Sequence, residues 1–205
     1  MESQFSFKSI DKTSEYLHKD RGSKFYGYAY PVSSLTDVKD YLDALKELYP
    51  DASHICYAYI LGIEGEEYRA NDDGEPSNSA GQPILREIKS KEVTFTLVAV
   101  VRYFGGKKLG VAGLIDAYGT AAREALNLTN VKTTVLQKTL WIRHLGAKDF
   151  QVYEYANRLG YSIVETPNIP GGFFRIQIPF PEVDALMNAL ESLPNFDVTD
   201  NSSSV

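Results

Sequence analysis

The chain has 205 residues and a net charge of −6 at pH 7, with 43% hydrophobic and 12% aromatic residues. This length suits one large domain or two small ones with buried cores. The acidic balance excludes a surface that is basic throughout, so any anion site must be local. The single cysteine, Cys56, excludes an internal disulfide. Because the sequence shows neither a secretory leader nor a membrane span, we expect a cytoplasmic protein without a membrane partner.

The first half of the chain is predicted to mix strands and helices. Alternating aromatic and small residues predict strands over 5–10 and 25–31. Leucine and valine at helical spacing predict a helix over 35–49, with Ser34 as its N-cap. A strand, a polar loop, a short helix, a second strand and a long helix are then predicted over 54–61, 72–83, 84–90, 93–101 and 111–128.

The second half has a more regular pattern of strands and amphipathic helices. Its predicted elements are a strand, a helix, two strands, a helix and a strand, over 138–143, 148–159, 161–166, 173–178, 181–193 and 196–199. The order β-α-β-β-α-β is that of the ferredoxin-like split unit. We therefore expect an α+β protein with domains at 1–134 and 135–200 and a disordered tail at 201–205.

A strand, a Gly-Gly turn and a helix start follow one another between residues 98 and 118. Arg102, Lys107 and Lys108 place cations in this turn, while Gly105 and Gly106 allow the backbone to approach a bound group. Backbone N–H groups and the helix dipole converge on an anion in this geometry, so the turn predicts an anion or nucleic-acid site. The alternative is a tight strand-to-helix connection in which Arg102 pairs with an acid.

The polar loop contains three closely spaced acids, Asp72, Asp73 and Glu75. Such carboxylates can hold Mg²⁺ or Ca²⁺, but their spacing is not that of an EF-hand loop. We favour a loop whose acids accept hydrogen bonds from backbone N–H groups or meet Arg102 and the lysines. We expect no metal and no cofactor.

Two other groups of side chains offer chemistry in principle. His54 and Cys56 share a face of the predicted strand, but residues two apart stand side by side, and a free cysteine is commonly a core residue, so we expect no nucleophilic dyad. Tyr57, Tyr59, Tyr103 and Phe104 offer rings on which bases can stack, although aromatic residues in strands more often serve packing.

Four sequence blocks, in order, resemble the YigZ/IMPACT family, formerly an uncharacterised protein family. They are HxxYAY from residue 54, DDGEP from 72 with AGQP from 80, VRYFGGxxLG from 101, and GL from 113 with AYG from 117. The whole chain resembles the bacterial two-domain type. The resemblance implies an N-terminal IMPACT domain of the ribosomal-protein α/β type, akin to domain IV of elongation factor G. It implies a ferredoxin-like C-terminal domain, akin to domain V of that factor.

The chain also departs from the family pattern. Asn78-Ser79 stands where the family usually has Gly-Thr, and Ala112 stands where it has a glycine. Asp116 replaces an arginine near the start of the helix. An acid there suits the helix dipole but opposes an incoming phosphate.

The resemblance implies a role in translation, because eukaryotic members are similar to translation regulators that bind a coactivator of an initiation-factor kinase. We prefer a non-enzymatic protein that docks on RNA, the ribosome or a translation factor. Its docking surface would combine the Arg102–Gly110 turn with the family-type loop, where His54, Asp72, Asp73 and Glu75 lie. Two alternatives stay open: a metal-assisted hydrolase or phosphoryl-transfer enzyme using the loop acids, and a purely protein-binding regulator.

Overall fold

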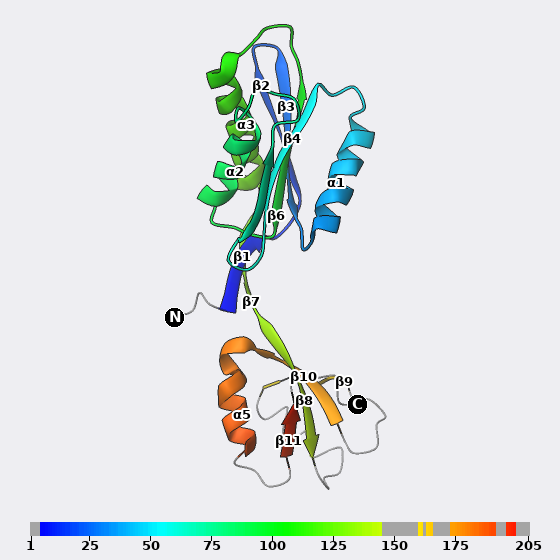
Figure 1. The fold of residues 1–205 in the computed structure, drawn as a ribbon, viewed down its shortest axis with the longest axis vertical. Coiled ribbons are helices and arrows are strands. Elements are labelled where there is room, and N and C mark those ends of the chain that lie inside the picture. The colour runs from blue at the N-terminus through cyan, green and yellow to red at the C-terminus, as the bar shows by residue number, and fades with distance from the viewer. Residues whose placement is uncertain (1–4, 145–159, 162, 166–172, 192–195, 200–205) are drawn as a thin grey trace. The chain divides into compact units, whose positions relative to one another are not determined.

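The computed structural model describes residues 5–144, 160–161, 163–165, 173–191 and 196–199 (Figure 1). The chain divides into two compact units, Ser6–Thr134 and Val135–Val205 together with Met1–Phe5. The helix predicted at 148–159 and the tail predicted at 201–205 lie outside the described residues.

The Ser6–Thr134 unit is built on an antiparallel sheet in the order β2-β3-β6-β4-β5. Its strands are β2 (Ser14–Asp20), β3 (Ser23–Pro31), β4 (His54–Leu61), β5 (Glu67–Asn71) and β6 (Thr96–Tyr103). A separate pair joins β1 (Ser6–Ile10) to β7 (Val131–Val135). The strand at 54–61 is confirmed at both ends, whereas β2 was not predicted, because its seven residues alternate between half-buried and exposed positions.

Helices cover both faces of this sheet (Figure 1). Helix α1 (Leu35–Leu48) lies on one face, and α2 (Gly81–Ser90) and α3 (Gly110–Asn127) lie on the other. Ser34 caps α1 as predicted: its side chain accepts from the Asp37 N–H at 3.2 Å, and the Asp37 carboxylate accepts from the Ser34 N–H. This reciprocal capping box satisfies N–H groups that a helix start otherwise leaves unpaired.

Two hydrophobic cores lie on opposite faces of the sheet. Side chains of β4 alternate between them as the two-residue period of a strand requires. Cys56, Ala58 and Ile60 enter the core under α2 and α3, whereas Tyr59 and Leu61 enter the core under α1. The sheet is thus buried on both sides along its central strands, and this rigid frame positions the loops at its ends.

The second unit has a four-stranded antiparallel sheet in the order β11-β8-β10-β9. Its strands are β8 (Gln137–His144), β9 (Ile163–Glu165), β10 (Phe173–Pro179) and β11 (Phe196–Thr199). A 3-10 turn over Phe180–Glu182 leads into α5 (Val183–Glu191), which begins two residues later than the predicted helix. Buried side chains of the strands and α5 form its core: Leu140, Ile142, Ile176, Ile178, Val183 and Leu186. The protein is therefore α+β in class.

Within the part of the chain that the structure describes, no helix combines the length and the apolar character needed to cross a membrane.

Candidate functional site

A buried ion pair joins two sequence blocks that lie far apart in the chain. Arg102, near the end of β6, donates from its guanidinium to Oε1 of Glu75, in the loop after β5. The Tyr118 hydroxyl of α3 donates to the same oxygen at 2.8 Å. The guanidinium carbon of Arg102 also lies 5.4 Å from the ring centre of Phe25 and 5.5 Å from that of Phe104. Arg102 is therefore paired with an acid in the interior, which is the alternative to an anion site that the sequence left open for this residue.

Asp72 organises the polar loop through three backbone hydrogen bonds. Its carboxylate accepts from the N–H groups of Asn78 at 2.8 Å, Ala80 at 3.0 Å and Gly81 at 2.8 Å. These last two residues form the start of α2, which has no side-chain cap from its own N-cap residue, Ala80. A carboxylate is favourable at this position because the N-terminus of a helix carries partial positive charge. Asp72, which directly follows β5, thus caps the N-terminus of α2.

Asp73 and His54 connect the same loop to the start of β4. The Asp73 carboxylate accepts from the Ile55 N–H at 2.6 Å, and the Asp73 carbonyl oxygen lies 2.7 Å from Nδ1 of His54. The other ring nitrogen of His54 lies 3.9 Å from Oε1 of Glu75. The three acids are engaged at separate places, and the described residues contain no group of three His, Cys, Asp or Glu side chains disposed to hold a metal ion.

Cys56 is buried beneath this loop. Its thiol donates to the Asp72 carbonyl oxygen at 3.0 Å. Burial raises the pKa of the Cys56 thiol well above its usual range. Because the thiolate is the nucleophilic form, this cysteine is a packing and hydrogen-bonding residue of the interior. No thiol–imidazole dyad is formed with His54, whose ring contacts Asp73 instead.

Two turns pack backbone against backbone at one end of the sheet. A Cβ atom on Gly105 would lie 1.9 Å from the carbonyl carbon of Gly22, in the β2–β3 turn. The Gly105 N–H also donates to Oγ of Ser23 at 3.1 Å. Any larger residue at Gly105 would separate these turns. Gly106, by contrast, is needed for its backbone angle, with φ at +86° and open space around it.

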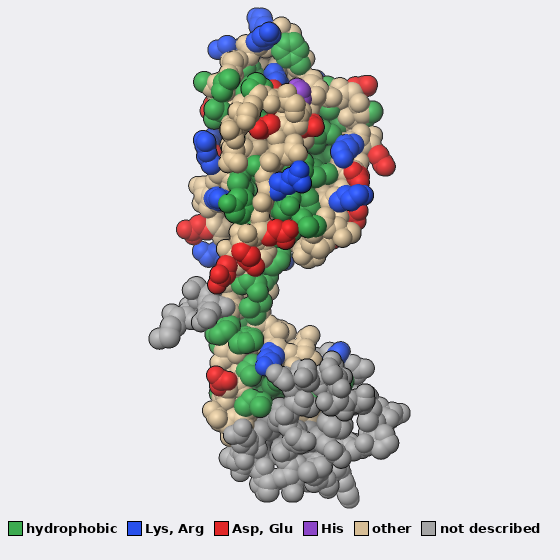
Figure 2. Space-filling view, viewed as in Figure 1, with side chains coloured by type: hydrophobic (Ala, Val, Ile, Leu, Met, Phe, Trp, Pro, Cys, Tyr) green, Lys and Arg blue, Asp and Glu red, His purple; other side chains and the backbone are tan. Residues whose placement is uncertain are grey.

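Five cations gather on these two turns and on the strand ends that lead into them, a group that we name the basic tip. Figure 2 shows Lys and Arg side chains at this upper end of the Ser6–Thr134 unit. All five are exposed, and among the described residues no acid lies within ion-pair distance of any of them. The basic tip consists of Lys19, Arg21, Lys24, Lys107 and Lys108.

The structure therefore separates the cations that the sequence placed in one predicted anion site. Lys107 and Lys108 lie exposed in the basic tip, whereas Arg102 is buried with Glu75. Lys19, Arg21 and Lys24 were not predicted as site residues because strand β2 was not predicted. The available signal was Gly22, a turn-forming residue between two polar segments; it follows Arg21 in the two-residue loop, and both residues have positive φ. Asp116 is exposed on α3.

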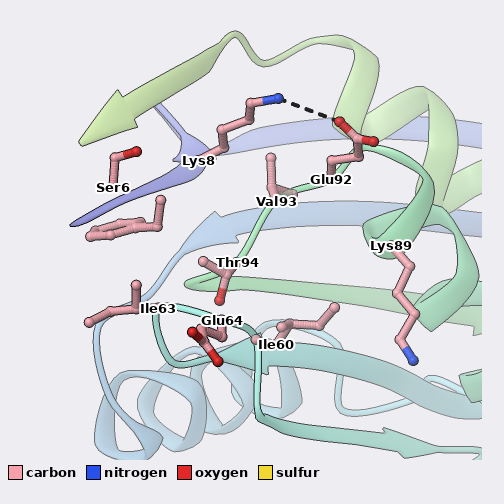
Figure 3. Close-up of a pocket in the computed structure, with 11 residues that line it drawn as sticks. Ser6, Lys8, Ile60, Ile63, Glu64, Lys89, Glu92, Val93 and Thr94 are labelled. Carbon is pink, nitrogen blue, oxygen red and sulfur yellow. Dashed lines mark hydrogen bonds and ion pairs between the residues drawn. The ribbon is translucent and has the colours of Figure 1, made fainter. Parts of the chain in front are cut away.

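A cavity of about 350 Å³ lies at the other end of the same sheet (Figure 3). Its apolar wall includes Ile60, Ile63 and Val93, and an ion pair of 3.4 Å between Lys8 and Glu92 lies beside it. It contains none of the predicted site residues. The basic tip and the acidic loop are thus separate from this cavity.

The Impact N-terminal domain family matches residues 21–126, just over half of the chain. The chain belongs to the IMPACT family. The match runs from the β2–β3 turn to the last turn of α3, and so contains Arg21 and Lys24 of the basic tip, the Asp72 loop and the Gly105 turn. The family resemblance drawn from the four sequence blocks is confirmed.

Two bacterial members of the IMPACT family illustrate the relationship. The family member YvyE of Bacillus subtilis (strain 168) is 36% identical over 142 residues, covering 69% of this chain and 64% of the relative. The family member YigZ of Escherichia coli (strain K12) is 33% identical over 122 residues, covering 58% of this chain and 60% of the relative. The matched regions thus span less than two thirds of the length of these relatives.

A solved structure extends the likeness in fold to nearly the whole chain. This crystal structure of a hypothetical protein gives a TM-score of 0.73 at 20% identity, covering 98% of this chain and all of the other. At this level of identity the likeness concerns the fold. The IMPACT family membership and the α+β fold with an Impact N-terminal domain are therefore both established for this chain.

Proposed function

We propose that this IMPACT family member is a non-enzymatic protein that docks on RNA, including the RNA of the ribosome, and modulates translation. The observation that carries this proposal is the basic tip on a chain whose net charge is −6. Exposed cations grouped on two adjoining turns attract phosphates locally, whereas the rest of an acidic protein repels them. The resemblance to the IMPACT family, whose eukaryotic members are similar to translation regulators, supports the functional context.

The acids beside the tip favour binding over catalysis. The carboxylates of Asp72, Asp73 and Glu75 accept hydrogen bonds from three different parts of the protein, and among the described residues they do not form a group disposed to hold a metal ion. Their work in the fold is structural: they hold the loop, the start of α2 and the end of β6 together. We therefore prefer a docking role to metal-assisted hydrolysis or phosphoryl transfer.

The topology of the second unit supports a proposal about its fold. We propose that residues 1–134 and 135–200 are two domains and that the second is ferredoxin-like. The order β11-β8-β10-β9 places the first and third strands of this unit in the centre of an antiparallel sheet. Helix α5 connects the third strand to the fourth, as in a β-α-β-β-α-β unit.

The test is a charge reversal at the basic tip with Lys107→Glu and Lys108→Glu. Both side chains are exposed, so the fold should be preserved, whereas Arg102 is unsuitable because it is buried. A control of equal charge change is Lys12→Glu with Arg86→Glu, which alters exposed cations outside the tip. Cosedimentation with purified ribosomes and binding to labelled RNA are measured over a salt series.

We expect the tip variant to bind RNA and ribosomes more weakly and with a shallower salt dependence than the parent. Each lost phosphate contact should reduce the logarithmic salt slope by roughly 0.7 for single strands. The control variant should bind like the parent. Equal binding by the tip variant and the parent would contradict the proposal, and binding to a protein that survives high salt would favour the protein-binding alternative.

A further inference from the structure

The α1 side of the sheet is left partly uncovered near the basic tip. Helix α1 ends at Leu48, and Tyr49 caps its C-terminus. Tyr49, Tyr26 of β3 and Tyr103 of β6 are each partly exposed there. We name these three residues the tyrosine platform. The three side chains belong to the margin of the core under α1 and remain open to solvent on one side.

The three rings of the tyrosine platform support one another. Ring centres are 5.5 Å apart for Tyr26 and Tyr49, and 6.2 Å apart for Tyr26 and Tyr103 and for Tyr49 and Tyr103. The Tyr49 hydroxyl is hydrogen-bonded to that of Tyr28, which is buried. Packed rings lose little conformational freedom when a ligand binds, so the platform is preorganised for contact with another flat group.

Strand register places two lysines beside these rings. Lys19 of β2 is directly opposite Lys24 of β3, and Lys24 is directly opposite Tyr103 of β6. Residues opposite each other in antiparallel strands point to the same face, and Lys24 and Tyr26 share that face because they are two positions apart. A row of lysine, lysine and tyrosine therefore crosses the end of the sheet, with Tyr26 beside it.

The opposed lysines indicate a negatively charged ligand. Like charges directly opposite on a sheet are destabilising, and neither ammonium group has an acid within ion-pair distance among the described residues. A bound phosphate between them would remove this repulsion. Three acids lie nearby. Asp20 follows Lys19 directly but is opposite Ser23, so it belongs to the other face of the sheet. Burial and the charge of Asp51 raise the pKa of the Tyr103 hydroxyl, and Glu15 lies opposite Tyr28, two residue pairs along the same face from the two lysines.

We propose that the tyrosine platform, together with Lys19 and Lys24, binds a single-stranded segment of RNA. Unpaired bases stack on the exposed faces of Tyr26 and Tyr103, and the phosphates that connect them lie against the two lysines. The bases of a duplex are already stacked on one another, so only a single strand can use both parts of the surface. This inference rests on the proposed function and specifies the form of RNA recognised and a second surface that adjoins the basic tip.

The test uses the full chain and a fluorescein-labelled 12-nucleotide RNA of mixed sequence, alone and annealed to its complement. Tyr26→Leu and Tyr103→Leu remove the rings, while Tyr26→Phe and Tyr103→Phe keep them. Lys19→Gln with Lys24→Gln removes the opposed charges. The matched control is Tyr68→Leu, which removes a tyrosine that is 55% exposed on β5, at the other edge of the sheet. Thermal unfolding shows which variants keep the parent fold.

We expect each Tyr→Leu variant to bind the single strand at least about fivefold more weakly, since one base–aromatic stack contributes about 1–3 kcal/mol. The Phe variants and Tyr68→Leu should bind like the parent, and the lysine variant should show a shallower salt slope. The parent should prefer the single strand to the duplex.

Several outcomes would overturn this inference. They are parental affinity in the folded Leu variants, losses of equal size in the Leu and Phe variants at both positions, or preference for the duplex. If the parent still binds RNA through Lys107 and Lys108 in these cases, the proposed function stands and the inference about the platform fails. If the parent binds neither RNA nor ribosomes, both fail, and a protein partner becomes the remaining explanation for the surface.

Discussion

Glu75 and Arg102 form a buried ion pair that fastens the loop after β5 to the end of β6. Their side chains are 4% and 7% exposed, respectively, and the Tyr118 hydroxyl of α3 completes the contact. Loop, strand and helix thus meet at one carboxylate. Such a pair gives little stability compared with well-packed apolar residues, but removal of one partner leaves a charge without compensation in the interior.

We predict that Arg102→Met lowers the free energy of unfolding by about 3–5 kcal/mol. The double variant with Glu75→Leu should lose less than the sum of the two single changes, because no unpaired charge remains. Urea unfolding measures each variant. The surface pair of Arg123 and Glu87, 3.7 Å apart, provides the control, and Arg123→Met should cost at most about 1 kcal/mol. Additive losses in the double variant would show that the two buried side chains do not act as a pair.

Asp72 provides a second prediction, because one carboxylate serves three backbone donors. We expect Asp72→Ala to lower the free energy of unfolding by about 2 kcal/mol, the upper range for loss of a helix cap. Hydrogen exchange should become faster at the amides of Asn78, Ala80 and Gly81. Asp73→Ala is the comparison: it removes one carboxylate acceptor, that of the Ile55 N–H, and places alanine at a φ of 42°, so exchange should become faster at Ile55 and stay unchanged at Ala80 and Gly81. Equal exchange rates in parent and Asp72→Ala would contradict this role.

The sequence predicted those elements whose apolar residues follow a clear period. Strand β4 was located at both ends because its side chains alternate between two cores, and α1 was located from its leucine spacing and the Ser34 cap. Strand β2 lies at an edge of the sheet, where Glu15, Leu17 and Lys19 face solvent, so its sequence SEYLHKD carries little hydrophobic signal. Edge strands are stabilised by pairing that local sequence does not reveal.

The candidate site could be predicted from the sequence only in part, for a similar reason. The sequence shows Arg102 five residues before Lys107, which suggested one group of cations. It does not show that Glu75, 27 positions away, lies against Arg102 in the fold. The expectation that the loop acids accept from backbone N–H groups or meet Arg102 is confirmed: Asp72 and Asp73 accept from backbone groups, and Glu75 accepts from Arg102. The pairing of Lys19 with Lys24 required knowledge of the β2–β3 register.

Cys56 gives a prediction about pH. Burial raises the pKa of its thiol in the folded protein, whereas the unfolded thiol loses its proton above about pH 8.5. Rising pH therefore stabilises the unfolded state selectively, and stability should fall by about 1.4 kcal/mol per pH unit between roughly pH 8.5 and 10. Below the unfolded pKa the thiol is protonated in both states and has no such effect.

Cys56→Ala should remove this component of the pH dependence while lowering stability at neutral pH. The measurement is urea unfolding of both proteins from pH 7 to 10, and the difference between the two curves isolates the thiol from other titrating groups. In addition, the thiol should resist alkylation in the folded parent at pH 8 and react after unfolding. Parallel pH curves for parent and variant would contradict the assignment of the slope to Cys56.

The two glycines of the β6–α3 turn should respond differently to alanine. At Gly105 a Cβ atom would lie 1.9 Å from the backbone of Gly22, so Gly105→Ala must push the β2–β3 turn away and should lower the free energy of unfolding by several kcal/mol. At Gly106 a Cβ atom meets nothing within 4 Å, and only the positive φ opposes it, at a cost of about 1–2 kcal/mol. Urea unfolding compares the two variants under the same conditions.

Because Gly105 holds together the turns that carry Arg21, Lys107 and Lys108, its alanine variant should also weaken RNA binding more than Gly106→Ala does. Equal effects of the two substitutions on both stability and RNA binding would show that the contact between the turns does not organise the basic tip.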